Sequence, residues 1–140
     1  KILHLNKNII VMDYIKHNQV YVWWHSFAHR IIDSLAMDSG YSSASIRERI
    51  YYDEEGKVGG CLIFAHTAGA DGTLGGLVAL ANTSDFKNIL LNAREKVFEC
   101  SNGPLCSNEF PSSCYACMYM SETTCIHNNR FLDRRILRNW

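Results

Sequence analysis

Five of the six cysteines of this chain lie between residues 100 and 125. Cys114 and Cys117 form a C-x-x-C pair, which allows two thiolates to reach one ion from a single tight turn. Cys125 follows after a short loop, and Cys100 and Cys106 precede the pair at comparable distances. Four thiolates at such separations suit tetrahedral Zn²⁺. A site that protein ligands fill completely is structural, because it leaves no position for a reacting water.

One ion cannot take all five thiolates, so the sequence leaves the ligand set partly open. We predict that Cys114, Cys117 and Cys125 are ligands. Cys106 is favoured as the fourth, because it lies in a loop after Gly103 and Pro104 and is free to turn toward the pair. Cys100 follows a predicted helix that constrains its direction, although a helix end can also supply a zinc ligand. The predicted zinc subregion is about residues 100–129.

Two other chemistries compete with zinc. An even number of cysteines permits a disulfide set, but Cys61 lies far away in an apolar run and nothing in the sequence suggests a secretory route. A redox-active C-x-x-C needs an exposed pair that opens a helix after a strand, whereas residues 109–113 read as a loop. Zinc is therefore the predicted cofactor.

Charge and hydropathy limit the classes of partner. The 140 residues include 14 basic and 14 acidic side chains, which argues against a nucleic-acid grip over the whole surface but permits a local basic patch. No apolar run approaches the length of a membrane span, so no membrane association is expected. We expect one domain over residues 1–140, and the start at Lys1 suggests a piece of a longer polypeptide.

The pattern of apolar residues predicts helices and strands in alternation. Strands are expected at 9–12 and 20–24, and a hairpin is expected from 50–52 and 58–66. Helices are expected at about 26–38, from about 77, at 84–99 with Ser84 as N-cap, and at 130–138 after Asn128 or Asn129. Gly40 should end the first of them. The predicted fold is α+β, a small mostly antiparallel sheet with about four helices, closed by a zinc knuckle of four cysteines.

Two histidines in the first predicted helix form an H-x-x-x-H pair. His25 and His29 share one helix face, but the metalloprotease version has Glu where this chain has Ser26. Because the sequence fixes no third ligand, buried imidazoles hydrogen-bonded to a neighbouring strand or loop are favoured over a second metal site. The glycine-rich loop 67–76 matches neither the G-x-G-x-x-G pattern of dinucleotide-binding proteins nor the Walker pattern of phosphate-binding loops. Asp71 in this loop either caps a turn or faces the two histidines.

Arginines gather at the C-terminal end. On a helix from residue 130, Arg130, Arg134 and Arg138 would share a face, with Arg135 beside them. Such a run is usually a solvated face, but four arginines beside a zinc site could also contact phosphate.

Three separated motifs carry a family resemblance. The segment 113–134, SCYACMYMSETTCIHNNRFLDR, resembles the C-terminal signature of DrmB-like proteins of the DISARM anti-phage defence system. It is also similar to a related domain that ends the MrfA-type DNA helicases. The segments HSFAH (25–29) and DGTLGGL (71–77) resemble the same domain, and the likeness spans about residues 23–138. The cysteine segment of the family begins with a C-x5-C pair, which Cys100 and Cys106 match.

The resemblance implies a zinc-stabilised, helicase-associated structural and interaction module that works on DNA. The implied partner is a helicase subunit, or a helicase domain of the same chain, and DNA contact could be indirect. The domain itself would be no enzyme, whereas its host or partner would be a DNA helicase and ATPase in the cytoplasm of a bacterium or archaeon. The alternative is a hydrolytic or second-metal enzyme centre built on His25, His29 and Asp71.

Overall fold

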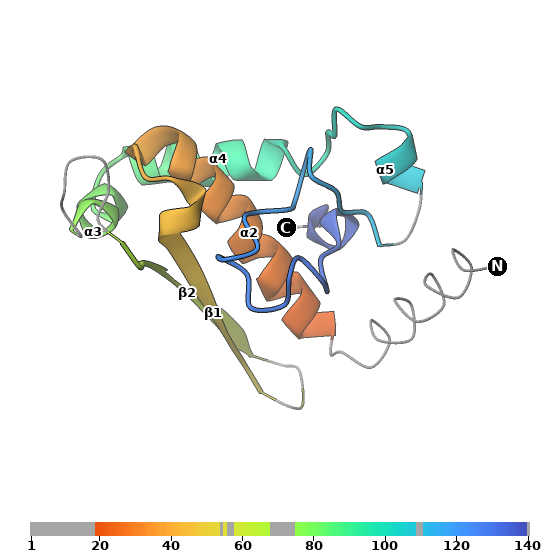
Figure 1. The fold of residues 1–140 in the computed structure, drawn as a ribbon, viewed down its shortest axis with the longest axis horizontal. Coiled ribbons are helices and arrows are strands. Elements are labelled where there is room, and N and C mark those ends of the chain that lie inside the picture. The colour runs from red at the N-terminus through yellow and green to blue at the C-terminus, as the bar shows by residue number, and fades with distance from the viewer. Residues whose placement is uncertain (1–18, 54, 56–57, 68–74, 109–110, 140) are drawn as a thin grey trace.

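The computed structural model describes residues 19–53, 55, 58–67, 75–108 and 111–139 (Figure 1). The strand expected at 9–12 and most of the glycine-rich loop, including Asp71, lie outside the described residues.

A long helix, α2 (Gln19–Ser39), runs through the middle of the molecule (Figure 1). It contacts both strands, the helices α3 and α4, and two short 3-10 segments. Side chains on most of its circumference are therefore buried, as expected of a helix that is covered on several sides. Gly40 follows the helix with a φ of 71°, the left-handed conformation that commonly ends a helix, so its predicted role as the stop is confirmed.

The strand expected at 20–24 is wrong, because these residues form the first turns of α2. β-branched and aromatic residues favour strands only weakly, and packing decides between the two structures. As part of the helix, Tyr21 and Val22 are buried. The helix expected at 26–38 is confirmed as the remainder of α2.

The predicted hairpin is present and packs against α2. A 3-10 turn, η1 (Ser43–Ser45), leads into β1 (Ile46–Tyr52), which pairs antiparallel with β2 (Gly59–Ala65). Glu48 lies opposite Ile63 in this register. Alternation along β1 places Ile46 and Glu48 on the buried face and Arg49 in solvent.

Three further helices follow the hairpin in the described chain: α3 (Gly76–Ala81), α4 (Asp85–Glu95) and the single turn α5 (Leu105–Asn108). The start of α3 and the presence of α4 agree with the predictions. Ser84 occupies the N-cap position of α4 as predicted, but its backbone is already helical and its side chain makes no capping hydrogen bond. The sequence-based number of helices stays a prediction.

The C-terminal segment is mostly loop. The helix expected at 130–138 is replaced by the short 3-10 segment η2 (Arg134–Leu137), whose cap is Asp133 rather than Asn128 or Asn129. Asn128, Asn129 and Phe131 have positive φ angles of 51°, 60° and 59°, which an α-helix does not permit. In Figure 1 these loops lie along α2.

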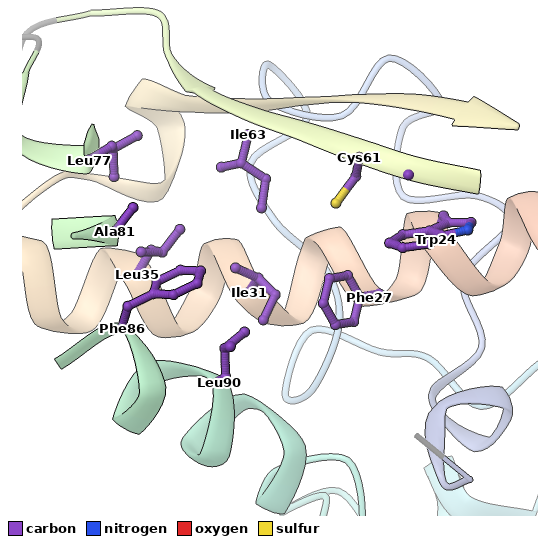
Figure 2. A pocket seen from close by; sticks show the side chains of 11 residues that line it. Trp24, Phe27, Ile31, Leu35, Cys61, Ile63, Leu77, Ala81, Phe86 and Leu90 are labelled. Carbon is purple, nitrogen blue, oxygen red and sulfur yellow. The ribbon is translucent and has the colours of Figure 1, made fainter. Parts of the chain in front are cut away.

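The main apolar core lies where α2, the hairpin and α4 meet. Its buried members are Ile31, Ile32, Leu35, Tyr41, Ile46, Ile89, Ala93 and Met120. Beside it, a cavity of about 400 Å³ opens between α2, β2, α3 and α4 (Figure 2). Among its lining residues Cys61 has the one ionisable side chain, and burial raises the pKa of that thiol to about 11. Cys61 is half-buried rather than fully buried, and its thiol is protonated at neutral pH.

In the part of the chain that the structure describes, none of the helices combines the length and the apolar character needed to span a membrane.

Candidate metal centres

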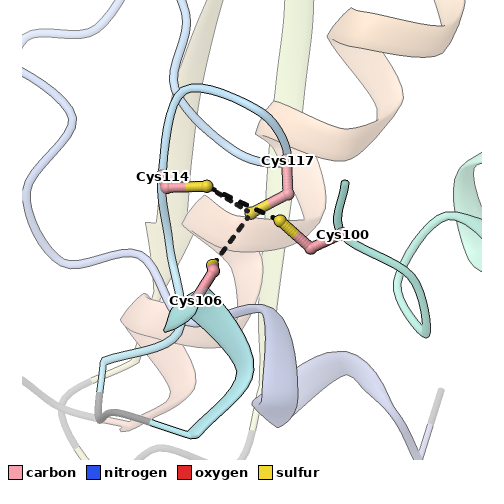
Figure 3. A group of neighbouring side chains, drawn as sticks. All are labelled: Cys100, Cys106, Cys114 and Cys117. Carbon is pink, nitrogen blue, oxygen red and sulfur yellow. Dashed lines mark hydrogen bonds between the residues drawn. The ribbon is translucent and has the colours of Figure 1, made fainter. Parts of the chain in front are cut away.

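Four cysteine side chains converge on one point at the end of the molecule that holds α5 (Figure 3). The Sγ atoms of Cys100 and Cys114 are 3.6 Å apart, those of Cys106 and Cys117 are 3.6 Å apart, and those of Cys114 and Cys117 are 3.7 Å apart. Ligands at a Zn–S distance of about 2.3 Å in a tetrahedron are about 3.8 Å from one another. The four sulfurs therefore have nearly the spacing of a tetrahedral zinc site.

Local hydrogen bonds place each of these cysteines. Cys100 follows the turn after α4, and its carbonyl accepts from the Gly103 N–H at 2.8 Å. Cys106 lies in α5. The Cys114 carbonyl accepts from the N–H groups of Cys117 and Met118 at 3.1 and 2.9 Å, which folds the C-x-x-C pair into a tight turn. The segment after α4, the helix α5 and the turn of the C-x-x-C pair thus bring their cysteines to one point.

The geometry disfavours the disulfide reading. All six cysteines are free, and the sulfur separations are far longer than the roughly 2.05 Å of a disulfide bond. Hydrogen bonds from the Ala116 N–H and the neighbouring thiols outweigh burial, which raises the pKa of Cys114, and lower that pKa to about 7. In the same group, burial raises the pKa of Cys106 to about 11 and also raises the pKa of Cys117.

The structure does not bring Cys125 to this group, although the sequence argument placed it there. Cys100, ranked last among the five, takes the position that Cys125 was expected to fill. The loop after Met118 turns back across α2, so the Cys125 thiol lies in a different buried group. The spacing of the cysteines along the sequence does not reveal that the loop leads Cys125 away from the other four.

That second buried group consists of His25, His29, Glu48 and Cys125, whose candidate ligand atoms all lie within 4.8 Å of one another. The Glu48 Oε1 atom is 3.4 Å from His25 Nε2 and 3.6 Å from His29 Nε2. The Cys125 Sγ atom is 3.3 Å from His25 Nε2. α2 supplies the histidines, β1 supplies the carboxylate and the C-terminal loop supplies the thiol.

Backbone carbonyls fix the orientation of both imidazoles. His25 Nδ1 lies 3.2 Å from the Phe131 carbonyl, and His29 Nδ1 lies 2.9 Å from the Met118 carbonyl. A carbonyl only accepts, so each Nδ1 donates and each Nε2 faces Glu48. These contacts are the expected hydrogen bonds to loop backbone, and they leave both Nε2 atoms turned toward Glu48.

Glu48 is the residue of this group that sequence reasoning missed. Burial raises its pKa, but the adjacent imidazoles of His25 and His29 outweigh that effect and lower the pKa to about 2. Burial lowers the pKa of His25, while Cys125 and Glu48 raise it, and the net shift is upward. The sequence did contain a signal for Glu48. Side chains alternate along a strand, so Glu48 lies on the same face of β1 as the isoleucines at 46 and 50, which is the face toward the core.

The predicted arginine face does not exist. Arg130 and Arg138 are exposed, but Arg134 is completely buried and donates through NH1 to the Val97 carbonyl at 2.7 Å. Arg135 is half-buried, with Nε 3.5 Å from Asp133 Oδ1. The sequence pattern assumed an α-helix, and the absence of that helix separates the four side chains.

A second buried arginine lies against the four-cysteine group. Arg30 on α2 donates through NH1 to the Cys117 carbonyl and pairs with Asp33 at 3.2 Å. Burial lowers the pKa of Arg30, Asp33 and Cys117 raise it, and the nearby Arg134 lowers it further. Two guanidinium groups are therefore buried within electrostatic range of each other, and Arg30 is also within range of Cys117.

Comparison with known proteins identifies the family. Residues 27–118 match the model of the MrfA Zn-binding domain. Over 126 residues the chain is 38% identical to the DISARM protein DrmB of Bacillus paralicheniformis, and this alignment covers 84% of the chain. The chain spans only 22% of the length of that relative. Together with the four-cysteine cluster, these matches show that the chain belongs to the MrfA Zn-binding domain family.

Proposed function

We propose that Cys100, Cys106, Cys114 and Cys117 bind one Zn²⁺ in a closed structural site. The observation that carries this proposal is the spacing of the four sulfurs, 3.6 to 3.7 Å for the three measured pairs. All four ligand positions would be thiolates, so the ion would stabilise the fold and would not activate water. It would join the end of α4 and the helix α5 to the C-terminal loop.

The buried arginines support an anionic centre at this place. Four thiolates and one Zn²⁺ carry a net charge of about −2, as follows from the charges of the ligands and the ion. Arg30 and Arg134 are both almost completely buried nearby and would offset that charge. Asp33 already offsets part of this positive charge through its pair with Arg30, and an anionic zinc centre would offset more of it.

Metal analysis of Cys117→Ser tests this site, with Cys61→Ser as the matched control. Cys61 is a half-buried free cysteine outside both buried groups. We expect Cys117→Ser to lose at least one zinc per chain and to exchange amide hydrogens faster at 96–108 and 111–139, because structural zinc binding is coupled to folding. Cys61→Ser should keep its zinc. A zinc content equal to that of the unmodified chain in Cys117→Ser would refute the four-cysteine assignment.

At the level of the whole protein, we propose a structural and interaction module of a DISARM-type anti-phage protein that works in the cytoplasm with a helicase partner. The likeness to DrmB supports this role, and the share of that relative covered by the chain fits a module within a larger protein. Affinity purification of the full-length protein from phage-challenged cells should recover a helicase. Its absence from the recovered proteins would contradict the proposed partner.

The hydrolytic alternative is not favoured. His25 and His29 are completely buried, and Glu48 and Cys125 occupy the positions beside their Nε2 atoms. A substrate and an attacking water would both need open positions at such a centre.

A further inference from the structure

We propose that His25, His29, Glu48 and Cys125 form a second metal site for Zn²⁺. The ion would fasten the C-terminal loop to α2 and β1, at a place distinct from the four-cysteine group. The inference concerns binding and structure and assigns no reaction to this site.

The separations of the ligand atoms fit one ion. With Zn–N and Zn–O distances of about 2.1 Å and Zn–S of about 2.3 Å, tetrahedral ligands lie about 3.4 to 3.6 Å apart, and the measured separations in this group are within about 0.3 Å of those values. The three measured separations are 3.3 Å for Cys125 Sγ to His25 Nε2, 3.4 Å for Glu48 Oε1 to His25 Nε2, and 3.6 Å for Glu48 Oε1 to His29 Nε2. Two nitrogens, one oxygen and one sulfur suit zinc, whereas Mg²⁺ and Ca²⁺ prefer oxygen ligands alone.

Two buried polar atoms in this group have no hydrogen-bond partner among the described residues. They are His29 Nε2 and Glu48 Oε2, and both side chains are almost completely buried. A buried polar atom without a hydrogen-bond partner needs an explanation, and a bound ion would supply one for both of these atoms at once. Both imidazoles also use Nδ1 for a backbone carbonyl, which is the usual outer hydrogen bond of a metal-binding histidine and leaves Nε2 for the ion.

Charge balance also favours an ion. A carboxylate, a thiolate and two neutral imidazoles carry a charge of about −2, which one Zn²⁺ cancels. A metal-free group would instead need a buried imidazolium beside Glu48. Such an arrangement would still leave Glu48 Oε2 without a partner among the described residues.

The loop that carries Cys125 is held firmly from both sides. Thr124 donates to the Ser43 carbonyl at 3.1 Å. The Asn129 side chain bridges Met120, accepting from its N–H at 2.9 Å and donating to its carbonyl at 2.8 Å. Three residues at 128, 129 and 131 adopt positive φ angles, and such backbone strain is concentrated at functional sites. The neighbouring Phe131 carbonyl is the one that orients His25.

A pocket lies beside this group. A pocket of about 210 Å³ is lined by Glu48 together with Tyr21, Thr124 and His127. Glu48 is the one member of the proposed ligand set among its lining residues, which also include Arg47 and Arg49.

The test is the metal content and the ligand composition of the purified chain. We expect two zinc ions per chain, with X-ray absorption showing five sulfurs and three nitrogen or oxygen atoms shared between the two coordination spheres. Zinc coordinated by sulfur alone would overturn the second site while leaving the first intact. Coordination without a four-sulfur component would instead contradict the four-cysteine site, so the two proposals fail separately.

Near-isosteric variants give the second arm of the test. Glu48→Gln and Cys125→Ser should each lose one zinc per chain and the nitrogen and oxygen component of the X-ray absorption signal, with the four-sulfur component unchanged. Cys61→Ser is the control and should keep both ions. In Co²⁺-loaded protein, Cys125→Ser should remove the weaker thiolate charge-transfer bands and keep those of the four-cysteine site. Unchanged zinc content and unchanged coordination in both variants would overturn the proposal.

Discussion

At the scale of single residues, arginines of the C-terminal segment lie in opposite environments, one buried and one exposed, which the sequence does not distinguish. Arg134 is completely buried, whereas Arg138, four positions later, is exposed. Arg134 donates to the Val97 carbonyl and ties η2 to the end of α4. It is therefore part of the interior, and a contact of this side chain with phosphate is excluded by its burial.

Arg134→Gln should lower the free energy of unfolding by about 2–3 kcal/mol, because a shorter, neutral side chain leaves the buried Val97 carbonyl without its charged donor. The matched control is Arg138→Gln, a surface substitution expected to change that free energy by less than about 0.5 kcal/mol. Chemical denaturation of the metal-loaded protein measures both. Equal effects of the two substitutions would show that the interior role of Arg134 is wrong.

The sequence predicted the chemistry of the metal ligands better than their grouping. Cys114 and Cys117 were identifiable because a C-x-x-C pair defines its own local geometry. Glu48 and Cys125 meet His25 only through the tertiary fold, and Cys125 is 100 residues away along the chain. No local spacing rule connects such residues, so the second group could not be assembled from the sequence.

At the scale of helices and strands, the hairpin packs so closely on α2 that one position requires glycine. A Cβ atom added at Gly59 would lie 2.1 Å from Trp24 Nε1 on α2. At the next residue, Gly60, a Cβ atom would meet no other atom within 4 Å. Two adjacent glycines in β2 thus face different environments.

Gly59→Ala should therefore destabilise the fold by about 1–3 kcal/mol, because Trp24 must move and the packing between β2 and α2 is disturbed. Gly60→Ala should be neutral or slightly stabilising, since alanine reduces the conformational freedom of the unfolded chain. Thermal unfolding compares the variants, and tryptophan fluorescence reports the displacement near Trp24. A Gly59→Ala protein as stable as Gly60→Ala would contradict this close packing.

Helices and strands with a clear local pattern were predicted correctly, whereas those decided by packing or by backbone conformation were not. The hairpin and α4 carry clear local patterns and were found. Residues 20–24 have strand-like composition but extend α2, because the helix is covered on several sides and buries Val22 and His25 together. The C-terminal arginines and apolar residues match a helical pattern, but the positive φ angles at 128, 129 and 131 prevent an α-helix there.

At the scale of the whole molecule, charge limits how the chain can meet nucleic acid. Fourteen basic residues balance 14 acidic ones, so long-range attraction to a duplex is weak. Of the four arginines at 130, 134, 135 and 138, Arg134 is buried and Arg135 is half-buried beside Asp133. The exposed Arg130 and Arg138 are left as the candidates for phosphate contact.

Two phosphate contacts predict a slope of about −2 for the logarithm of the DNA association constant against the logarithm of salt concentration. A full face of four arginines would give about −3.6. We expect the chain alone to bind duplex DNA weakly, with dissociation constants in the range of about 10⁻⁴ M at physiological salt. Fluorescence anisotropy at several salt concentrations measures the slope. The double variant with Arg130→Gln and Arg138→Gln should bring the slope close to zero. Nanomolar binding that survives physiological salt would instead make this domain a DNA-binding element in its own right, in place of a module that leaves this contact to the proposed helicase partner.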